Sequence, residues 1–218
     1  QARLKQQVAS ILSAPVYDVA IETPLQPAQR LSAQLGNQVV LKREDLQPVY
    51  SFKIRGAYTR VARLSPSERA RGVITASAGN HAQGLALAAQ RLGARALIVM
   101  PTTTPRLKVE GVCARGATAL LHGESFAEAL AHALQLAEQQ GYTFVPPFDA
   151  PDVIAGQGTV AVELLRQYQS PLHAVFVPVG GGGLIAGGAA YIKYLRPEIK
   201  VIGVEPEDSN CLQAAMKA

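Results

Sequence analysis

The sequence predicts an α/β fold built around a mostly parallel sheet. Short β-type runs alternate with helical stretches along nearly the whole chain, helix start and stop signals separate them, and the run Ala174–Val179 is entirely apolar. Parallel strands need a crossover connection, which is usually a helix, so this alternation favours parallel pairing. We expect an all-apolar strand such as Val175–Val179 to be covered by helices on both faces.

The first expected element is an amphipathic helix within the first twenty residues. Leu4, Val8, Ile11 and Leu12 recur at helical spacing and share one face. The segment lacks the apolar core of a signal peptide. No stretch of the chain reaches the roughly 18 uninterrupted apolar residues of a transmembrane helix, so the sequence predicts no membrane association.

The helices that follow are recognised by their ends. Ser65-Pro66-Ser67-Glu68 and Ser125-Phe126-Ala127-Glu128 are capping boxes, and Pro66 suits the first helical position. Gly93 and Gly141 are typical helix stops. In chain order, helices are expected over residues 50–64, from 65 onward, and over 80–92, 106–115, 125–140, 154–168 and 184–195.

The expected strands lie between these helices. Ligands of parallel α/β sheets bind outside the carboxyl ends of the strands, near helix N-termini. Three segments therefore become candidate site segments: the surroundings of Lys53, the run Ser77–His81 and the run Gly180–Gly183. In chain order, strands are expected over residues 39–42, 73–75, 96–100, 118–121, 144–145, 174–179 and 200–205.

The composition is that of an ordinary globular protein. The 218 residues are 48% hydrophobic and 17% charged, and 21 Lys and Arg against 16 Asp and Glu give a net charge of +5. The basic residues are scattered, which favours small anions over nucleic acid as partners. The two cysteines, Cys113 and Cys211, have no metal-type spacing. The sequence thus predicts no metal site, no disulfide framework and a reducing cytoplasmic location.

The four glycines from Gly180 to Gly183 are a candidate phosphate cradle. They join an apolar strand to a helix that begins near Leu184. Exposed backbone N–H groups and the positive end of the helix dipole together favour a phosphate. A flexible turn that needs glycine only for positive φ is the simpler alternative, but it requires fewer glycines.

The same loop also fits a dinucleotide-binding fingerprint. Gly181, Gly183 and Ala186 have the G-x-G-x-x-A spacing, and Glu205 closes the next strand, where a ribose-binding acid belongs. An NAD-dependent oxidoreductase is therefore an alternative of another class. It leaves the preceding strand–helix units without a role.

Lys53 lies in the run Ser51-Phe52-Lys53-Ile54-Arg55, where a helix is expected to start. A helix N-terminus disfavours a cation, which lowers the pKa of the amine, and a neutral amine is what Schiff-base formation requires. The plain alternative is a solvated surface lysine.

The run Ser77-Ala78-Gly79-Asn80-His81 follows a strand and opens a helix. Small residues and free N–H groups at such a turn suit a carboxylate. Asn80 either caps the helix or donates a hydrogen bond to a cofactor oxygen. We interpret His81 as an ordinary partly buried histidine without a role in proton transfer.

The runs SFKIRGA, SAGNHAQG and VGGGGL occur in this order and at this spacing. Together they resemble the fold-type II pyridoxal-phosphate enzymes (the tryptophan synthase β-like fold), in particular the threonine/serine dehydratase branch and its biosynthetic threonine deaminases. The resemblance extends to Thr23-Pro24-Leu25, to the run from Leu41 to Asp45, to Pro146-Pro147-Phe148-Asp149 and to the run from Ile154 to Thr159. It covers almost the whole chain.

The resemblance implies roles for individual residues. Lys53 holds the pyridoxal 5'-phosphate covalently, Phe52 lies against its ring, and Asn80 hydrogen-bonds its ring hydroxyl. The phosphate is held by Gly180, Gly181, Gly182, Gly183 and Leu184. The substrate carboxylate is received by Ser77, Ala78, Gly79 and His81.

The implied reaction is β-elimination of L-threonine to 2-oxobutanoate and ammonia, the first step of isoleucine biosynthesis. L-serine is a second expected substrate. Serine racemase and catabolic serine/threonine dehydratase are alternatives within the family, and an inactive fragment is a further one. A homo-oligomer is also expected from the resemblance.

The resemblance further implies two parallel-sheet lobes. Residues 47–148 would form the small lobe, and residues 1–46 with 149–218 would form part of the large one. Family members continue past this point, so we expect a fold truncated at its C-terminus. The partner of the pyridine nitrogen and the isoleucine-responsive domain would then lie beyond residue 218.

Overall fold

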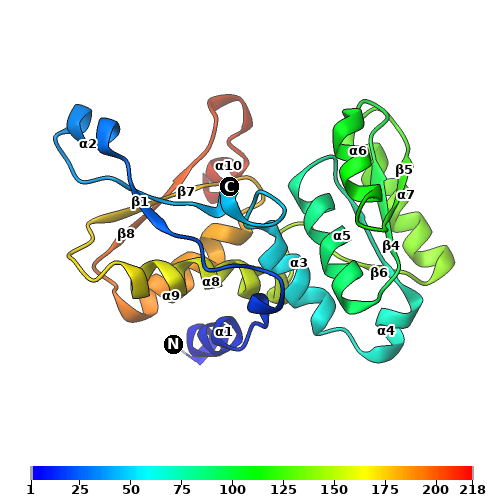
Figure 1. Ribbon diagram of the computed structural model, residues 1–218, viewed down its shortest axis with the longest axis horizontal. Coiled ribbons are helices and arrows are strands. Elements are labelled where there is room, and N and C mark those ends of the chain that lie inside the picture. Colours follow the sequence, from blue (N-terminus) through cyan, green and yellow to red (C-terminus); the bar gives the residue numbers. More distant parts are fainter. Residues whose placement is uncertain (1, 218) are drawn as a thin grey trace.

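The computed structural model describes residues 2–217, in which helices and strands alternate as expected for an α/β fold (Figure 1). The α-helices are α1 (Ala2–Leu12), α2 (Gln29–Leu35), α3 (Lys53–Ala62), α4 (Pro66–Arg71), α5 (Asn80–Leu92), α6 (Arg106–Cys113), α7 (Phe126–Gln140), α8 (Pro151–Gln167), α9 (Gly183–Leu195) and α10 (Cys211–Lys217). The strands are β1 (Leu25–Pro27), β2 (Val40–Lys42), β3 (Val73–Ala76), β4 (Ala96–Met100), β5 (Thr118–Leu121), β6 (Thr143–Phe144), β7 (Ala174–Pro178) and β8 (Lys200–Val204). Short 3₁₀ turns cover Val16–Asp18, Glu44–Leu46 and Glu207–Ser209.

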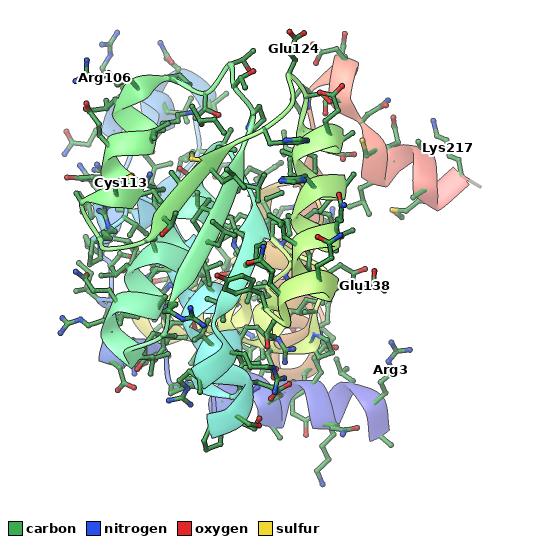
Figure 2. All side chains as sticks on the ribbon, turned by 90° about the vertical axis from the view of Figure 1, so that its right-hand side faces the viewer. Arg3, Arg106, Cys113, Glu124, Glu138 and Lys217 are labelled. Carbon is green, nitrogen blue, oxygen red and sulfur yellow. The ribbon has the colours of Figure 1, made fainter. Side chains whose placement is uncertain are left out.

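A four-stranded parallel sheet with the order β5-β4-β3-β6 lies on one side of the molecule (Figure 1). Its two faces are buried against different helices. Ile98 and Met100 lie on the face covered by α5, which in turn packs on α3, whereas Ile74 and Val99 pack with α7. Figure 2 shows the two sides of this sheet, with Cys113 of α6 on one and the helix that carries Glu138 on the other. The predicted parallel pairing is confirmed here.

The strands β7 and β8 form a separate parallel pair, and β1 and β2 form an antiparallel one. Our expectation that residues 175–179 are covered on both faces is wrong. Helices α8 and α9 pack against the face that carries Val175 and Val201, while Phe176 on the opposite face is 67% exposed. Side chains alternate along a strand, so one packed layer buries only every second residue.

Helix α8 packs so closely against α3 and α9 that backbone atoms of neighbouring helices are in contact. A Cβ placed on Gly156 would lie 2.4 Å from the carbonyl oxygen of Arg55, and one on Gly187 would lie 2.3 Å from that of Ile154. Only glycine permits such an approach. This close packing fixes the position of α3, and with it the position of Lys53, the first residue of that helix.

A cluster of buried charges joins α3, α8 and the chain around β2. The Arg55 guanidinium is fully buried and donates to the carboxylates of Glu163 at 2.6 Å and Glu44 at 2.7 Å. Lys42 and Tyr17 also donate to Glu163. Buried charges are tolerated only when they are paired in this way. The sequence pattern did not predict this cluster.

Local signals predicted the helix ends well. Ser65 and Ser125 both form the expected capping boxes, and Gly93 and Gly141 both end helices in the left-handed conformation. Helix α3 begins three residues later than predicted. The preceding Tyr50 has a φ of +59°, which no α-helix contains. No helix among residues 2–217 has the length and apolarity needed to cross a bilayer.

The N-terminal helix is amphipathic as predicted, with one exception. Val8 and Ile11 are buried, but Leu12 is 61% exposed and does not share their environment. Residues 25–27 and 29–35 were predicted as neither strand nor helix. Both elements are short and leave most of their side chains exposed, so they lack the periodic burial that marks an element in sequence.

Candidate active site

One short segment, Val145–Phe148, contacts all three of the predicted site segments. The Lys53 amine donates a hydrogen bond to the carbonyl oxygen of Pro147 at 2.6 Å. The His81 ring lies 3.0 Å from the carbonyl oxygen of Val145. Phe148 packs directly on the glycine loop, because its ring occupies the space where a side chain on Gly181 would lie. The three segments are thus brought together around a fourth.

Lys53 is the first residue of α3, and its side chain is largely withdrawn from solvent. Burial lowers the pKa of the Lys53 amine below its ordinary value of 10.5. The predicted direction of the shift is therefore correct, and desolvation is its cause. The Phe52 ring lies beside the amine, with its centroid 5.6 Å from Nζ. A partly desolvated amine of lowered pKa is chemically suited to attack a carbonyl carbon.

The loop after β3 is held by Ser77. Its hydroxyl accepts hydrogen bonds from the backbone N–H groups of Gly79 at 3.2 Å and Ala82 at 3.3 Å. The alternative that Asn80 caps the helix is wrong. Gly79 occupies the N-cap position without a side-chain cap, and Asn80 is the first helical residue, with an exposed side chain. The Asn80 amide is consequently free to donate to a ligand.

His81 is more completely buried than predicted, with 2% of its surface exposed. Burial lowers the pKa of its imidazole to about 4, and the nearby Lys53 amine adds to this effect. The ring is therefore neutral near pH 7 and carries no proton that it could readily give up. The expectation that His81 takes no part in proton transfer remains a prediction.

The four positions of the loop after β7 differ in whether, and why, the structure requires glycine there. Gly182 has a φ of +84°, which favours glycine. A Cβ on Gly181 would lie 2.1 Å from the Phe148 ring, and one on Gly183 would lie 2.8 Å from the Phe148 carbonyl oxygen. Gly180 has no atom within 4 Å of its Cβ position and needs no positive φ. Packing thus explains Gly181 and Gly183, and the positive φ explains Gly182, whereas neither requires glycine at position 180.

The loop also has the features of an anion site. Helix α9 starts at Gly183 and runs for 13 residues, and the half-buried Leu184 follows in its first turn. The first backbone N–H groups of such a helix have no partner within it and attract an anion. A cavity of about 400 Å³ adjoins the loop and is lined by Phe148, Ile154, Ala186 and Leu212 among others.

These groups fit a cofactor that has a carbonyl at one end and a phosphate at the other. The buried amine of Lys53 suits the carbonyl. The helix N-terminus beside the open position of Gly180 suits the phosphate. The exposed amide of Asn80 can serve a polar ring substituent.

The dinucleotide alternative finds no support in the site. The Glu205 carboxylate accepts hydrogen bonds from the backbone N–H groups of Leu212 and Gln213, both at 2.9 Å. Glu205 therefore supports the start of α10, where the dinucleotide prediction required it to face a ribose.

The contacts made by Pro147 and Phe148 were not predicted from the residues. The run Pro146-Pro147-Phe148-Asp149 is marked as part of a site only by the family resemblance. Every residue has a backbone carbonyl oxygen, so the sequence does not indicate which one accepts a hydrogen bond. The two prolines that follow a predicted strand were the only distinctive local feature of this segment.

Comparison with known proteins is consistent with this chemistry. A family model described as pyridoxal-phosphate dependent enzyme matches residues 16–218. The chain is 60% identical over 211 residues to the biosynthetic L-threonine dehydratase of Burkholderia multivorans, an alignment that covers 95% of this chain and 42% of that protein. The chain spans about two fifths of the length of this curated relative.

Two solved structures share the fold. The processed form of threonine deaminase isoform 2 from Solanum lycopersicum matches with a TM-score of 0.92 and 56% identity, covering 94% of this chain and 56% of the other. The serine racemase of Dictyostelium discoideum matches with a TM-score of 0.89 and 33% identity, covering 96% of this chain and 69% of the other.

Proposed function

The chain belongs to the family of pyridoxal-phosphate dependent enzymes, and we propose that it carries the cofactor-binding lysine and phosphate cradle of an L-threonine dehydratase. The observation that carries this proposal is the convergence of Lys53, the Ser77–His81 loop and the glycine loop on the segment Val145–Phe148. The similarity to biosynthetic threonine dehydratases selects the substrate.

In this proposal each end of the cofactor has its own residues. Lys53 holds the carbonyl end, with Phe52 against the ring and the exposed amide of Asn80 donating to the ring hydroxyl. The phosphate lies at the start of α9, where Gly180 leaves room for it. The remaining phosphate contacts come from Gly181, Gly182, Gly183 and Leu184.

When bound, pyridoxal 5'-phosphate supplies an electron sink for the electron pair released at the α-carbon of an amino acid. The Lys53 amine, whose pKa is lowered by burial, accepts the proton from that α-carbon. The loop from Ser77 to His81 orients the substrate by receiving its carboxylate on backbone N–H groups at the start of α5. The net reaction converts L-threonine into 2-oxobutanoate and ammonia, with water lost and regained.

Serine racemization is the competing activity within the family. The chain is less similar to a serine racemase, at 33% identity, than to the threonine dehydratases, at about 60%. We therefore propose elimination from L-threonine as the main reaction and elimination from L-serine as a secondary one.

The test begins with cofactor capture. The chain is incubated with pyridoxal 5'-phosphate, reduced with borohydride and digested, and the modified peptide is found by mass spectrometry. We expect modification of Lys53 in the wild-type chain and none in Lys53→Ala. Capture at another lysine, or equal capture by Lys53→Ala, contradicts the proposal.

The loaded chain is then assayed with L-threonine and L-serine, and 2-oxo acid and D-serine are measured separately. Formation of 2-oxobutanoate that depends on Lys53 supports a threonine dehydratase. D-serine as the main product identifies a racemase, and capture of the cofactor without any turnover identifies a binding fragment.

Three sequence-based expectations remain proposals beside this one. They are the division into a small lobe of residues 47–148 and a large lobe, assembly as a homo-oligomer, and a cytoplasmic location. Plant relatives with similar sequences are described as chloroplastic.

A further inference from the structure

The segment that receives the Lys53 amine is anchored through Val145. This residue is fully buried, and its backbone N–H donates to the Ile74 carbonyl oxygen at 2.9 Å, extending the pairing of β6 with β3. Its carbonyl oxygen lies 3.0 Å from His81 Nε2. The next two residues are prolines, which have no N–H to donate. Val145 is therefore the last point before Phe148 at which main-chain donors can fix the segment.

The hydrogen bond to Val145 defines the tautomer and the protonation state of the His81 ring. A carbonyl oxygen can only accept, so Nε2 must carry the hydrogen, and Nδ1 is then the unprotonated nitrogen. Among residues 2–217, Nδ1 is buried and has no hydrogen-bond partner. A second proton would place an unpaired charge in the interior, which is strongly unfavourable.

We propose that His81 is a positioning residue whose imidazole ring fixes the Val145 carbonyl and so places the two groups that follow it. These groups are the Pro147 carbonyl, which accepts from Lys53, and the Phe148 ring, which packs on the glycine loop. The importance of this placement for catalysis rests on the proposed function. The placement itself does not, because it concerns contacts within the chain alone.

A matched pair of variants separates the hydrogen bond from the bulk of the ring. In His81→Gln, the side-chain amide nitrogen lies as many bonds from Cβ as imidazole Nε2 and can donate to Val145. In His81→Leu, a buried side chain of similar size has no donor. The first measurement is hydrogen–deuterium exchange of the ligand-free chain, followed at the Val145 amide, which donates to the Ile74 carbonyl oxygen.

We expect exchange at the Val145 amide to be about tenfold faster in His81→Leu, the effect of losing one buried hydrogen bond, and near the wild-type rate in His81→Gln. Exchange in α1, which packs on α8 and α9, serves as the internal control. Equal rates in the two variants, whether fast or slow, overturn the proposal, because the donor then makes no difference.

The second measurement is the rate at which Lys53 is captured by pyridoxal 5'-phosphate and borohydride. We expect about tenfold slower capture in His81→Leu and rescue in His81→Gln. Failure of the wild-type chain to capture the cofactor at Lys53 contradicts the proposed function, whereas the exchange result still decides the role of His81. Unchanged exchange with normal capture contradicts the role of His81 alone.

A wild-type measurement covers the case in which His81→Leu does not fold. Long-range ¹H–¹⁵N correlation spectra distinguish the two neutral histidine tautomers. We expect His81 to be neutral at pH 7 with the hydrogen on Nε2. A hydrogen on Nδ1, or an imidazolium at this pH, overturns the proposal.

Discussion

The Lys53 amine donates a 2.6 Å hydrogen bond to the carbonyl oxygen of Pro147, a residue 94 positions further along the chain. This contact joins the start of α3 to the segment that leaves the parallel sheet. The same segment touches His81 and the glycine loop. The position of the Lys53 amine is therefore set by the tertiary fold and by a main-chain hydrogen bond.

The lowered pKa of the Lys53 amine predicts how its reactivity depends on pH. Burial disfavours the charged form, so the amine loses its proton at a lower pH than the ordinary lysine value of 10.5. In competitive labelling of the ligand-free chain with trace acetic anhydride, Lys53 should titrate below the ordinary lysine value of 10.5. A Lys53 titration at or above 10.5 would contradict the desolvated site.

The lowered pKa of Lys53 also makes the free energy of unfolding depend on pH. Between the folded pKa and 10.5, the unfolded chain binds more protons at this position than the folded chain does. The contribution of Lys53 to the free energy of unfolding should therefore rise with pH through that window. Urea unfolding of the wild-type chain and Lys53→Ala across alkaline pH measures the difference.

Gly180 and Gly181 should respond differently to alanine. Gly180→Ala meets no protein atom, so the free energy of unfolding should change by less than about 0.5 kcal/mol. Its methyl group would occupy the proposed phosphate position and raise the Kd for pyridoxal 5'-phosphate by about tenfold or more, about 1.4 kcal/mol. Gly181→Ala meets the Phe148 ring and should cost about 1–3 kcal/mol of stability. Urea unfolding and cofactor titration of both variants check this, and unchanged binding in Gly180→Ala would remove the phosphate from this position.

The buried carboxylate of Glu163 should be far more important for stability than an exposed one. Glu163→Gln leaves the Arg55 charge only partly paired and should cost about 3–5 kcal/mol. The matched control is Glu110→Gln, which breaks the exposed pair with Arg106 and should cost less than about 1 kcal/mol. Equal losses in the two variants, measured by urea unfolding, would show that burial of the cluster has no energetic consequence.

Glu163 also predicts a pH dependence. Burial alone would raise the pKa of its carboxyl, but hydrogen bonds and charge from Arg55 together with bonds from Lys42 and Tyr17 hold it below the ordinary 4.5. A depressed carboxyl pKa contributes stability that is present above 4.5 and is lost as the pH falls through the folded value. The wild-type chain should therefore lose stability below about pH 4.5 more steeply than Glu163→Gln does.

Tyr50 is the one non-glycine residue among those described with a positive φ, and its side chain is 78% exposed. Tyr50→Gly should relieve backbone strain and stabilise the chain by about 1 kcal/mol. Gly93→Ala is the reverse control. Gly93 has a similar φ of +64° and free space around it, so alanine there should cost about 1 kcal/mol. Thermal unfolding should show shifts of opposite sign, and a destabilised Tyr50→Gly would mean that the tyrosine ring has a packing role.

Local signals predicted much of the fold. The bounds of α5 and β4 agree with the prediction, because Gly93 ends the helix and an apolar run closed by Pro101 marks the strand. The uncovered face of β7 was not foreseen, because an apolar run does not state how many layers pack on it.

Contacts between residues far apart in the chain could not be predicted from the sequence pattern. Arg55 and Glu163 are 108 positions apart, and neither stands out from the surface charges of the sequence. The three site segments were identified by residue type and family resemblance, and they do lie around one segment. The acceptor of the Lys53 amine is a peptide carbonyl, which every residue possesses, so no spacing of side chains could have singled it out. The roles assigned to the site residues in catalysis remain predictions.

The main-chain nature of that acceptor has a practical consequence for mutagenesis. An alanine scan of the site would replace Pro147 and still leave its carbonyl oxygen in place, so the scan would score the position as tolerant. Only changes that move the peptide itself, at the neighbouring anchors, would reveal its contribution. Tolerance to side-chain replacement at 147 should therefore be understood as robustness of the contact.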